Sequence, residues 1–185
     1  PKEVRVRLKA AALNHLDVWV RKGVASPKLP LPHVLGADGS GVVDAVGPGV
    51  EGFAPGDEVV INPGLSCGRC ERCLAGEDNL CPRYQILGEH RHGTYAEYVV
   101  LPEANLAPKP KSLSFEEAAA IPLTFLTAWQ MVVDKLGVRP GDDVLVMAFG
   151  EFGLTPRINS GAGRDHCTGA ARIVYAGGCL KMGQA

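Results

Sequence analysis

The chain has 185 residues, of which 46% are hydrophobic, and its formal net charge is −1 at pH 7. This length suffices for one ordinary domain, or for one domain and part of a second. The balanced charge provides no basic field for nucleic acid or anionic lipid, and no apolar run approaches the ~18 residues of a membrane-spanning helix. The first residues show no signal peptide, so we expect a cytoplasmic protein.

The first half of the chain predicts short strands that are separated by glycine and proline turns. Apolar and basic residues alternate from Val4 to Lys9, which is typical of a half-exposed strand. A short helix is expected at residues 14–22, and further strands are expected at residues 36–47, 58–62, 94–101 and 105–107. Such a series of strands predicts a mainly β fold, a small antiparallel barrel.

From Ser114 onward the pattern becomes helical. Ser114 and Glu117 have the spacing of a capping box, which starts a helix over residues 115–121. Residues 124–136 continue helically with apolar side chains on a common face. An apolar run at residues 144–147 then predicts a buried parallel strand. This change of character marks a boundary between two domains.

Four of the six cysteines lie close together in a polar segment, residues 63–82, here named the cysteine lobe. They are Cys67, Cys70, Cys73 and Cys81. Two-residue spacers let the backbone wrap around a tetrahedral ion that takes four thiolates at about 2.3 Å. Bacterial iron–sulfur ferredoxins have a similar run of cysteines, but their last spacer is shorter than the seven residues found here. The spacing therefore favours one structural zinc, with reduced, unliganded thiols as the alternative.

Spaced motifs resemble, taken together, the catalytic domain of the medium-chain dehydrogenase/reductase family, which includes zinc-containing alcohol dehydrogenases and quinone oxidoreductases. Beside the cysteine lobe, they are ALNHLD at 12–17, LGADGSGVVDAVG at 35–47, PGDEV at 55–59, GTYAEY at 93–98 and the helical region at 118–129.

The resemblance covers residues 1–148 and implies a GroES-like barrel with a zinc lobe over residues 1–113. Residues 114–147 would be linker helices and the first strand of a Rossmann domain, so that one strand of an incomplete α/β domain is present. The family's domain usually begins with a further pair of strands, and we therefore expect the barrel to be truncated at its N-terminus.

The resemblance also assigns residues to a catalytic pocket. In the alcohol dehydrogenases a catalytic zinc is held at positions that are matched here by Asn14, Ala37 and Asp38. Asparagine and alanine are not useful zinc ligands, so the resemblance implies no catalytic zinc, with Asn14 and Asp38 as catalytic residues. Asp17 matches a buried acid that supports the site. The alternatives are a helix cap for Asn14 and a turn residue for Asp38.

Three residues match positions near the cofactor of the family, NADH or NADPH. His15 matches a basic residue near the cofactor pyrophosphate, and Thr124 and Thr127 match the region beside the nicotinamide. The alternatives are a surface histidine and ordinary helix hydroxyls. The family chemistry is hydride transfer between NAD(P)H and a small-molecule alcohol, carbonyl, enone or quinone.

The expected dinucleotide-binding fingerprint does not follow the apolar run. Glu151 would repel a pyrophosphate, Pro156 would interrupt the helix, and no βαβ unit follows. Residues 146–185 instead resemble a segment of an uncharacterised alkaline-phosphatase/sulfatase-like family, in which Asp165 and His166 would match a metal-binding pair. We interpret residues 148–185 as an unrelated tail that need not be ordered.

Three hypotheses follow, in this order. The first is a truncated or chimeric NAD(P)H-dependent oxidoreductase with one structural zinc, inactive by itself because its cofactor domain is missing. The second is a stand-alone zinc or iron–sulfur module, and the third is the remnant of a metal-dependent phosphatase or sulfatase-like protein. Under the first hypothesis we expect homo-oligomers, since the linker helices lack the domain that would cover them.

Overall fold

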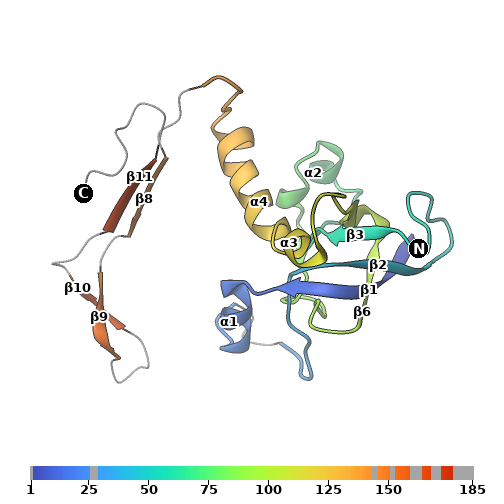
Figure 1. Ribbon diagram of the computed structural model, residues 1–185, viewed down its shortest axis with the longest axis horizontal. Helices are drawn as coiled ribbons and strands as arrows, with labels where there is room; N and C mark the ends of the chain where they lie inside the picture. The colour runs from blue at the N-terminus through green and yellow to red at the C-terminus, as the bar shows by residue number, and fades with distance from the viewer. Residues whose placement is uncertain are drawn as a thin grey trace. The chain divides into compact units, whose positions relative to one another are not determined.

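A five-stranded antiparallel sheet is the centre of the first of two units, Pro1–Gln130, in the computed structural model of the chain (Figure 1). The structure describes residues 2–25, 29–142, 146–150, 153–158, 164–167 and 172–176. The strands lie in the order β6-β1-β2-β3-β7. Their bounds are Glu3–Ala12 for β1, Asp38–Val46 for β2, Glu58–Ile61 for β3, Tyr98–Pro102 for β6 and Leu106–Pro108 for β7.

Alternation of apolar and polar residues places one face of β1 in the core. Val4 and Val6 are fully buried, whereas the arginines between and after them are exposed. Strand β1 pairs with β2 on one side and with β6 on the other, with register shifts in its pairing to β2. Gly41 of β2 allows this close pairing, since a Cβ atom there would collide with the carbonyl oxygen of Arg7. The predicted antiparallel sheet is confirmed, but the strand predicted at residues 94–101 begins only at Tyr98, because residues 94–97 form bends.

The core of the first unit gathers side chains from the sheet and from the segments that cover it. Its buried members are Val4, Val6, Val43, Val59, Ile61, Leu65, Leu87, Val99, Leu101 and Leu106. Burial of each such side chain stabilises the fold by about 1.5–3 kcal/mol before the entropy cost of ordering is counted. Most members are β-branched, which suits a pleated, half-buried surface.

The first predicted helix is α1, His15–Arg21. Asn14 has the extended backbone of an N-cap, and Gly23 adopts a left-handed φ of 72° just after the end. Asp17 in the first turn and Arg21 in the last turn complement the helix dipole. The remaining helices of this unit are α2 Glu71–Leu74, α3 Phe115–Ala119, α4 Pro122–Trp129 and the 3₁₀ turns Asp78–Leu80 and Glu103–Asn105.

The predicted capping box at the start of α3 is confirmed. The Ser114 backbone N–H donates to Glu117 Oε2 at 2.8 Å, and the Glu117 backbone N–H donates to Ser114 Oγ at 3.2 Å. Helix α3 lies against β1 and β2 (Figure 1), and the Ser40 hydroxyl of β2 donates to the Phe115 carbonyl oxygen at 2.6 Å. This contact holds the start of α3 against β2.

The second unit, Met131–Ala185, contains two pairs of strands. Strand β8, Val146–Gly150, pairs antiparallel with β11, Arg172–Ala176, and β9, Gly153–Ile158, pairs antiparallel with β10, Arg164–Cys167. The prediction of a parallel strand is therefore wrong for β8. A parallel pair needs a crossover, usually a helix, and the residues described between β8 and β11 form strands instead. Residues 143–145 lie outside the described ranges.

A π-helical turn, Gln130–Lys135, continues α4 across the boundary between the units. Together they match the helix that was predicted for residues 124–136. Within the described part of the chain, none of the helices has the length and apolar character needed to span a membrane.

Candidate functional site

The four clustered cysteines bring their sulfur atoms together, with all four within 4.8 Å of one another. The Cys70 Sγ lies 3.4 Å from Cys73 Sγ and 3.8 Å from Cys81 Sγ, and the Cys67 and Cys73 sulfurs are 3.9 Å apart. Four thiolates at about 2.3 Å from one tetrahedral ion are about 3.8 Å apart, whereas a disulfide requires about 2.05 Å. The cluster therefore has the dimensions of a single-ion site.

Tight turns of the cysteine lobe make this convergence possible. Strands β4, Gly64–Leu65, and β5, Gln85–Ile86, pair at the base of the lobe. Between them, Gly68 and Gly76 adopt left-handed φ values of 67° and 77°, which side chains other than glycine rarely allow. These two glycine turns let the short segment fold back so that its four sulfur atoms meet.

Hydrogen bonds within the cluster give its thiols different pKa values. A hydrogen bond from the Arg69 backbone lowers the pKa of Cys67 to about 5, against the opposing effect of burial. The pKa of Cys70 is raised to about 11, because burial and donation to neighbouring sulfurs outweigh a backbone hydrogen bond from Cys73. Thiols that share protons in this way lose them when a divalent cation binds, since the metal takes thiolates.

A second constellation surrounds Asp38 at the start of β2. The Asp38 side chain is fully buried, its Oδ1 accepts the Leu123 backbone N–H at 2.9 Å, and its Oδ2 accepts the Asn14 Nδ2–H at 3.0 Å. Burial raises the pKa of Asp38, and the charge of Asp17 adds to this, while the two hydrogen bonds lower it. Leu123 lies in the first turn of α4, so Asp38 joins the sheet to α1 and to the start of α4.

Asp17 forms a neighbouring centre of hydrogen bonds and is only 6% exposed, as expected of a buried acid. Its carboxylate accepts the Asn14 backbone N–H at 2.8 Å, the Gly36 N–H at 3.1 Å and the Tyr95 hydroxyl at 2.8 Å. Burial and the hydrogen bond to Asp17 raise the pKa of Tyr95, which keeps the phenol protonated as a donor. Thr94 donates its hydroxyl to the Asp38 carbonyl oxygen at 2.7 Å.

Tyr95 and Thr94 have a place in this constellation that the sequence analysis did not assign. Both belong to the GTYAEY motif, which begins at Gly93. The Thr94 N–H donates to the Gly36 carbonyl oxygen at 2.9 Å, so the motif packs directly against the glycine-rich start of β2. A signal for these two residues was present in the sequence, since the GTYAEY motif already supported the family resemblance and contains a threonine and a tyrosine with hydroxyl donors.

The structure brings Asn14 and Asp38 together, as their assignment to one pocket required. Ala37, at the third matched position, is fully buried and offers no ligand atom. Among the residues that the structure describes, the four cysteines are the only group of three or more side chains that could hold a metal ion. Asn14 and Asp38 are thus engaged in hydrogen bonds here, and the absence of a catalytic zinc stays a prediction.

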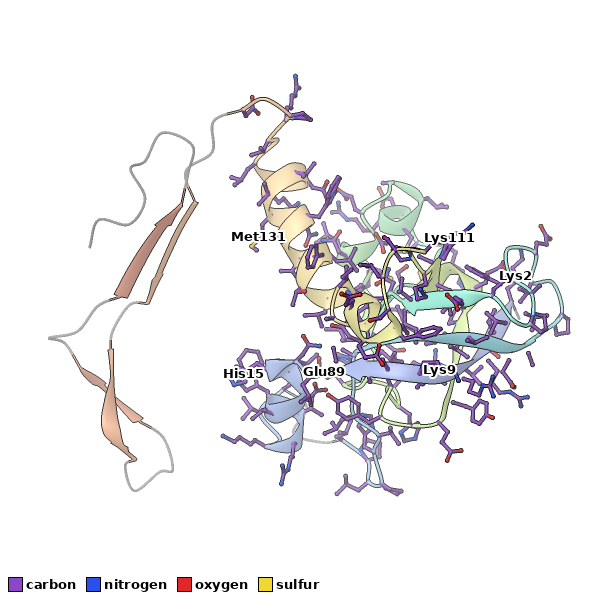
Figure 2. The ribbon with its side chains drawn as sticks, in the orientation of Figure 1. Lys2, Lys9, His15, Glu89, Lys111 and Met131 are labelled. Carbon is purple, nitrogen blue, oxygen red and sulfur yellow. The ribbon has the colours of Figure 1, made fainter. Side chains whose placement is uncertain are left out.

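The three residues assigned to cofactor binding take no part in the hydrogen bonds described around Asp38 and Asp17. His15 projects from the start of α1 away from the sheet (Figure 2), and its ring lies 4.7 Å from that of Trp19. Thr124 donates its hydroxyl back to the carbonyl oxygens of Ala120 or Ile121 at 3.2 Å, and Thr127 bonds back to the preceding turn of α4 in the same way at 2.7 Å. These bonds match ordinary helix hydroxyls, and the cofactor roles remain predictions.

A protein-family model described as the alcohol dehydrogenase GroES-like domain matches residues 1–111. The chain belongs to this family. A zinc-type alcohol dehydrogenase-like protein of Schizosaccharomyces pombe is 41% identical over 152 residues, which cover 81% of this chain and 42% of the relative. The predicted resemblance to the medium-chain dehydrogenase/reductase family is confirmed.

Solved structures of this GroES-like domain family agree with the fold. A crystal structure of an NAD-dependent alcohol dehydrogenase is 99% identical to this chain with a TM-score of 0.74, covering 77% of this chain and 41% of that one. A cobalt- and zinc-bound thermostable alcohol dehydrogenase from Pyrobaculum aerophilum is 40% identical with a TM-score of 0.68, covering 77% and 43%. This chain therefore spans less than half the length of each of these relatives.

A second family model, described as a protein of unknown function (DUF1501), matches residues 134–185. This match includes residues 148–185, which the sequence analysis interpreted as an unrelated tail. The side chains of Asp165 and His166 lie outside the described residues, and the resemblance to phosphatases or sulfatases stays a prediction.

Proposed function

We propose that this chain carries the substrate-side domain of an NAD(P)H-dependent oxidoreductase of the zinc-type alcohol dehydrogenase class. The observation that carries the proposal is the match of residues 1–111 to the GroES-like domain of these enzymes. In the complete enzyme the reaction is hydride transfer between nicotinamide and an alcohol, carbonyl, enone or quinone. In this proposal the 185-residue chain is inactive by itself, because no dinucleotide-binding fingerprint follows the apolar run at residues 144–147 and residues 134–185 match a different family model.

One structural zinc belongs to this proposal. The cysteine lobe would hold it through Cys67, Cys70, Cys73 and Cys81, and the sulfur separations support a single tetrahedral ion. A zinc ion with four protein ligands has no open position for substrate or water, so its role is to stabilise the lobe.

Asn14 is the residue we infer to meet the substrate oxygen. Its side-chain amide has two N–H donors, one of which is used by Asp38 Oδ2 at 3.0 Å. The second donor can stabilise negative charge that develops on a carbonyl oxygen, which is the task of a metal ion in zinc-dependent members. Asp38, held by the Leu123 N–H as well, fixes the position of Asn14.

A graft tests this role within an intact enzyme. Residues 1–125 of this chain would replace the matching segment of the 99% identical NAD-dependent alcohol dehydrogenase. We expect the graft to be active, and Asn14→Ala to lower kcat about 100-fold, which is the loss typical of one oxyanion donor. Lys111→Ala, a change outside the constellation, should leave kcat unchanged. Full activity of the Asn14→Ala graft would overturn the role of Asn14.

A fluorescence titration of the 185-residue chain with NADH, and then with NADPH, tests whether the chain alone is inactive. The complete NAD-dependent alcohol dehydrogenase that is 99% identical to this chain is the positive control. We expect no saturable binding by the chain. Saturation in the micromolar range would show that the chain, or a second copy of it, completes a cofactor site.

A stand-alone metal module is the second candidate, and the convergence of four thiols favours it independently of the dehydrogenase match. An iron–sulfur cluster distributes its cysteines over more than one iron, whereas the separations of 3.4–3.9 Å fit one ion. Elemental analysis and a visible absorption spectrum distinguish these cases. A colourless protein with one zinc per chain excludes the iron–sulfur form.

A further inference from the structure

A cavity of about 330 Å³ lies between the segment before β2 and the loop after β5. Besides leucine and proline, its lining consists of His33, His90, Arg91 and His92. These four side chains are here named the basic pocket. None of its described lining residues is acidic, and none belongs to the cysteine cluster or to the constellation around Asp38.

Backbone hydrogen bonds orient two of the imidazoles. The Val34 N–H donates to His92 Nδ1 at 3.2 Å, and the Ile86 N–H donates to His90 Nδ1 at 3.1 Å. A ring nitrogen that accepts a hydrogen bond carries no proton, so the proton of each neutral ring is on Nε2. Both rings therefore offer an Nε2–H donor, and Arg91 stands between them in the sequence with a permanent charge.

A metal does not suit these histidines. Among the described residues, only the four cysteines form a group with ligand atoms close enough to hold an ion. The Nε2 of His33 lies 3.0 Å from the Gly88 carbonyl oxygen, to which it donates, so this nitrogen is already used. The Nε2 donors of His90 and His92 and the positive charge of Arg91 suit an anion.

Charges around the pocket agree with an anion. Glu89 is the acid beside it, with Oε2 at 3.9 Å from His90 Nδ1, but its side chain is 11% exposed and does not line the cavity. A larger cavity of about 510 Å³ shares His90 and Arg91 and also reaches Cys67 and Arg83. Four thiolates around a divalent zinc would carry a net negative charge at that cavity, which makes it the less favourable place for an anion.

We propose that the basic pocket binds the phosphate group of a small molecule. Arg91 provides the charge and a fork of donors that matches a phosphate, while His90 and His92 donate from Nε2. The volume lies at the lower end of the range for small-ligand pockets, which suits a small phosphate ester. The proposal is independent of the proposed dehydrogenase function, since it uses none of the same residues.

Nuclear magnetic resonance of the histidine ring nitrogens in the 185-residue chain tests the proposal. The probes are inorganic phosphate, glycerol 3-phosphate and, as a neutral control, glycerol. We expect both phosphates to shift the Nε2 resonances of His90 and His92 saturably, and glycerol to shift neither. Tighter binding of the ester would identify a phosphorylated small molecule as the ligand, and equal binding of both phosphates would identify the free ion.

Matched variants locate the site. Arg91→Gln should weaken phosphate binding at least about tenfold, whereas Arg7→Gln removes the same charge from β1 and should leave it unchanged. His92→Asn keeps an acceptor for the Val34 N–H but loses the Nε2 donor, so it should also weaken binding. His92→Gln restores a donor near the Nε2 position and should bind more tightly than His92→Asn. Absence of saturable shifts in the unmodified chain, or equal weakening by Arg7→Gln, would overturn the proposal.

Discussion

Replacement of Asp38 should show that its hydrogen bonds stabilise the fold and that its charge does not. The fully buried carboxylate accepts from the Leu123 N–H at 2.9 Å and from Asn14 Nδ2 at 3.0 Å. Asp38→Ala leaves both donors without this partner, at about 1–3 kcal/mol for each buried, unsatisfied group. Because Leu123 and Asn14 are only partly buried, water offsets some of the cost, and we expect a loss of about 2–4 kcal/mol.

Asp38→Asn should cost less than about 1 kcal/mol at neutral pH. Its amide oxygen can accept the Leu123 N–H, and its amide nitrogen can donate to Asn14 once the Asn14 amide turns over. The variant also removes a charge that burial disfavours, as the raised pKa of Asp38 indicates.

The pH dependence of the free energy of unfolding follows from the raised pKa of Asp38. Since burial raises the folded-state pKa of Asp38 above 3.8, the folded state binds the proton more tightly than the unfolded state. The free energy of unfolding of the original chain therefore falls as pH rises through this window, whereas Asp38→Asn lacks the effect. The stability of Asp38→Asn relative to the original chain should improve from about pH 4 to about pH 7.

Urea titrations of the original chain, Asp38→Ala and Asp38→Asn at several pH values measure these differences. The cysteine lobe is common to all three proteins, so titration of its thiols cancels in the comparison. If Asp38→Asn were as damaging as Asp38→Ala at neutral pH, the negative charge at the start of α4 would be the stabilising feature, and our reasoning would be refuted.

Cys73→Ser should reduce the metal content, measured by elemental analysis, from one ion per chain to nearly none, while Cys179→Ser should leave it unchanged. Equal metal content in both variants would contradict the four-cysteine site. Tyr95→Phe removes the donor to Asp17 and should lower the free energy of unfolding by about 1–2 kcal/mol in urea; an unchanged midpoint would argue against this hydrogen bond. Trp129→Ser should shift the chain towards monomer in size-exclusion chromatography, because Trp129 is 62% exposed on α4. Elution identical to that of the original chain would exclude this surface from self-association.

Local sequence patterns predicted the elements whose causes are local. Alternation from Val4 onward fixed the buried face of β1, and the Ser114 and Glu117 pair fixed the start of α3. The cysteine spacing predicted the convergence of the four sulfur atoms because all four cysteines lie on one short segment. Each of these inferences needs only contacts between residues that are near in the sequence.

The pairing of β8 was not predictable in this way. An apolar run of this length suits a buried strand in a parallel or an antiparallel sheet, and periodicity does not distinguish them. The partner strand determines whether the pairing is parallel or antiparallel. The partner of β8 is β11, which lies more than 20 residues further along the chain, in the segment that matches a different family. The sequence indicated the loss of the dinucleotide fingerprint but not the strand that takes the place of a parallel neighbour.

The contacts of Asp38 show the same limit within the site. Its matched position suggested a pocket residue, but Leu123 is 85 residues away and Tyr95, which bonds to Asp17, is 78 residues from its partner. Such contacts depend on how the sheet brings the segments together. Sequence comparison could name Asn14 and Asp38 as neighbours, but only the structure shows that they bond to each other.

These bonds connect the same elements that a catalytic metal at the matched positions would connect. A metal ion bound at the positions of Asn14, Ala37 and Asp38 would tie the entry of α1 to the start of β2. Here the Asn14 amide and the Asp38 carboxylate make that link directly, and the Leu123 N–H extends it to α4. Ala37, fully buried beside them, leaves no polar atom unsatisfied where a third ligand would stand. Restoring a metal site would therefore require more than a histidine at position 37, because Asn14 and Asp38 would first have to give up the hydrogen bonds that now connect α1, β2 and α4.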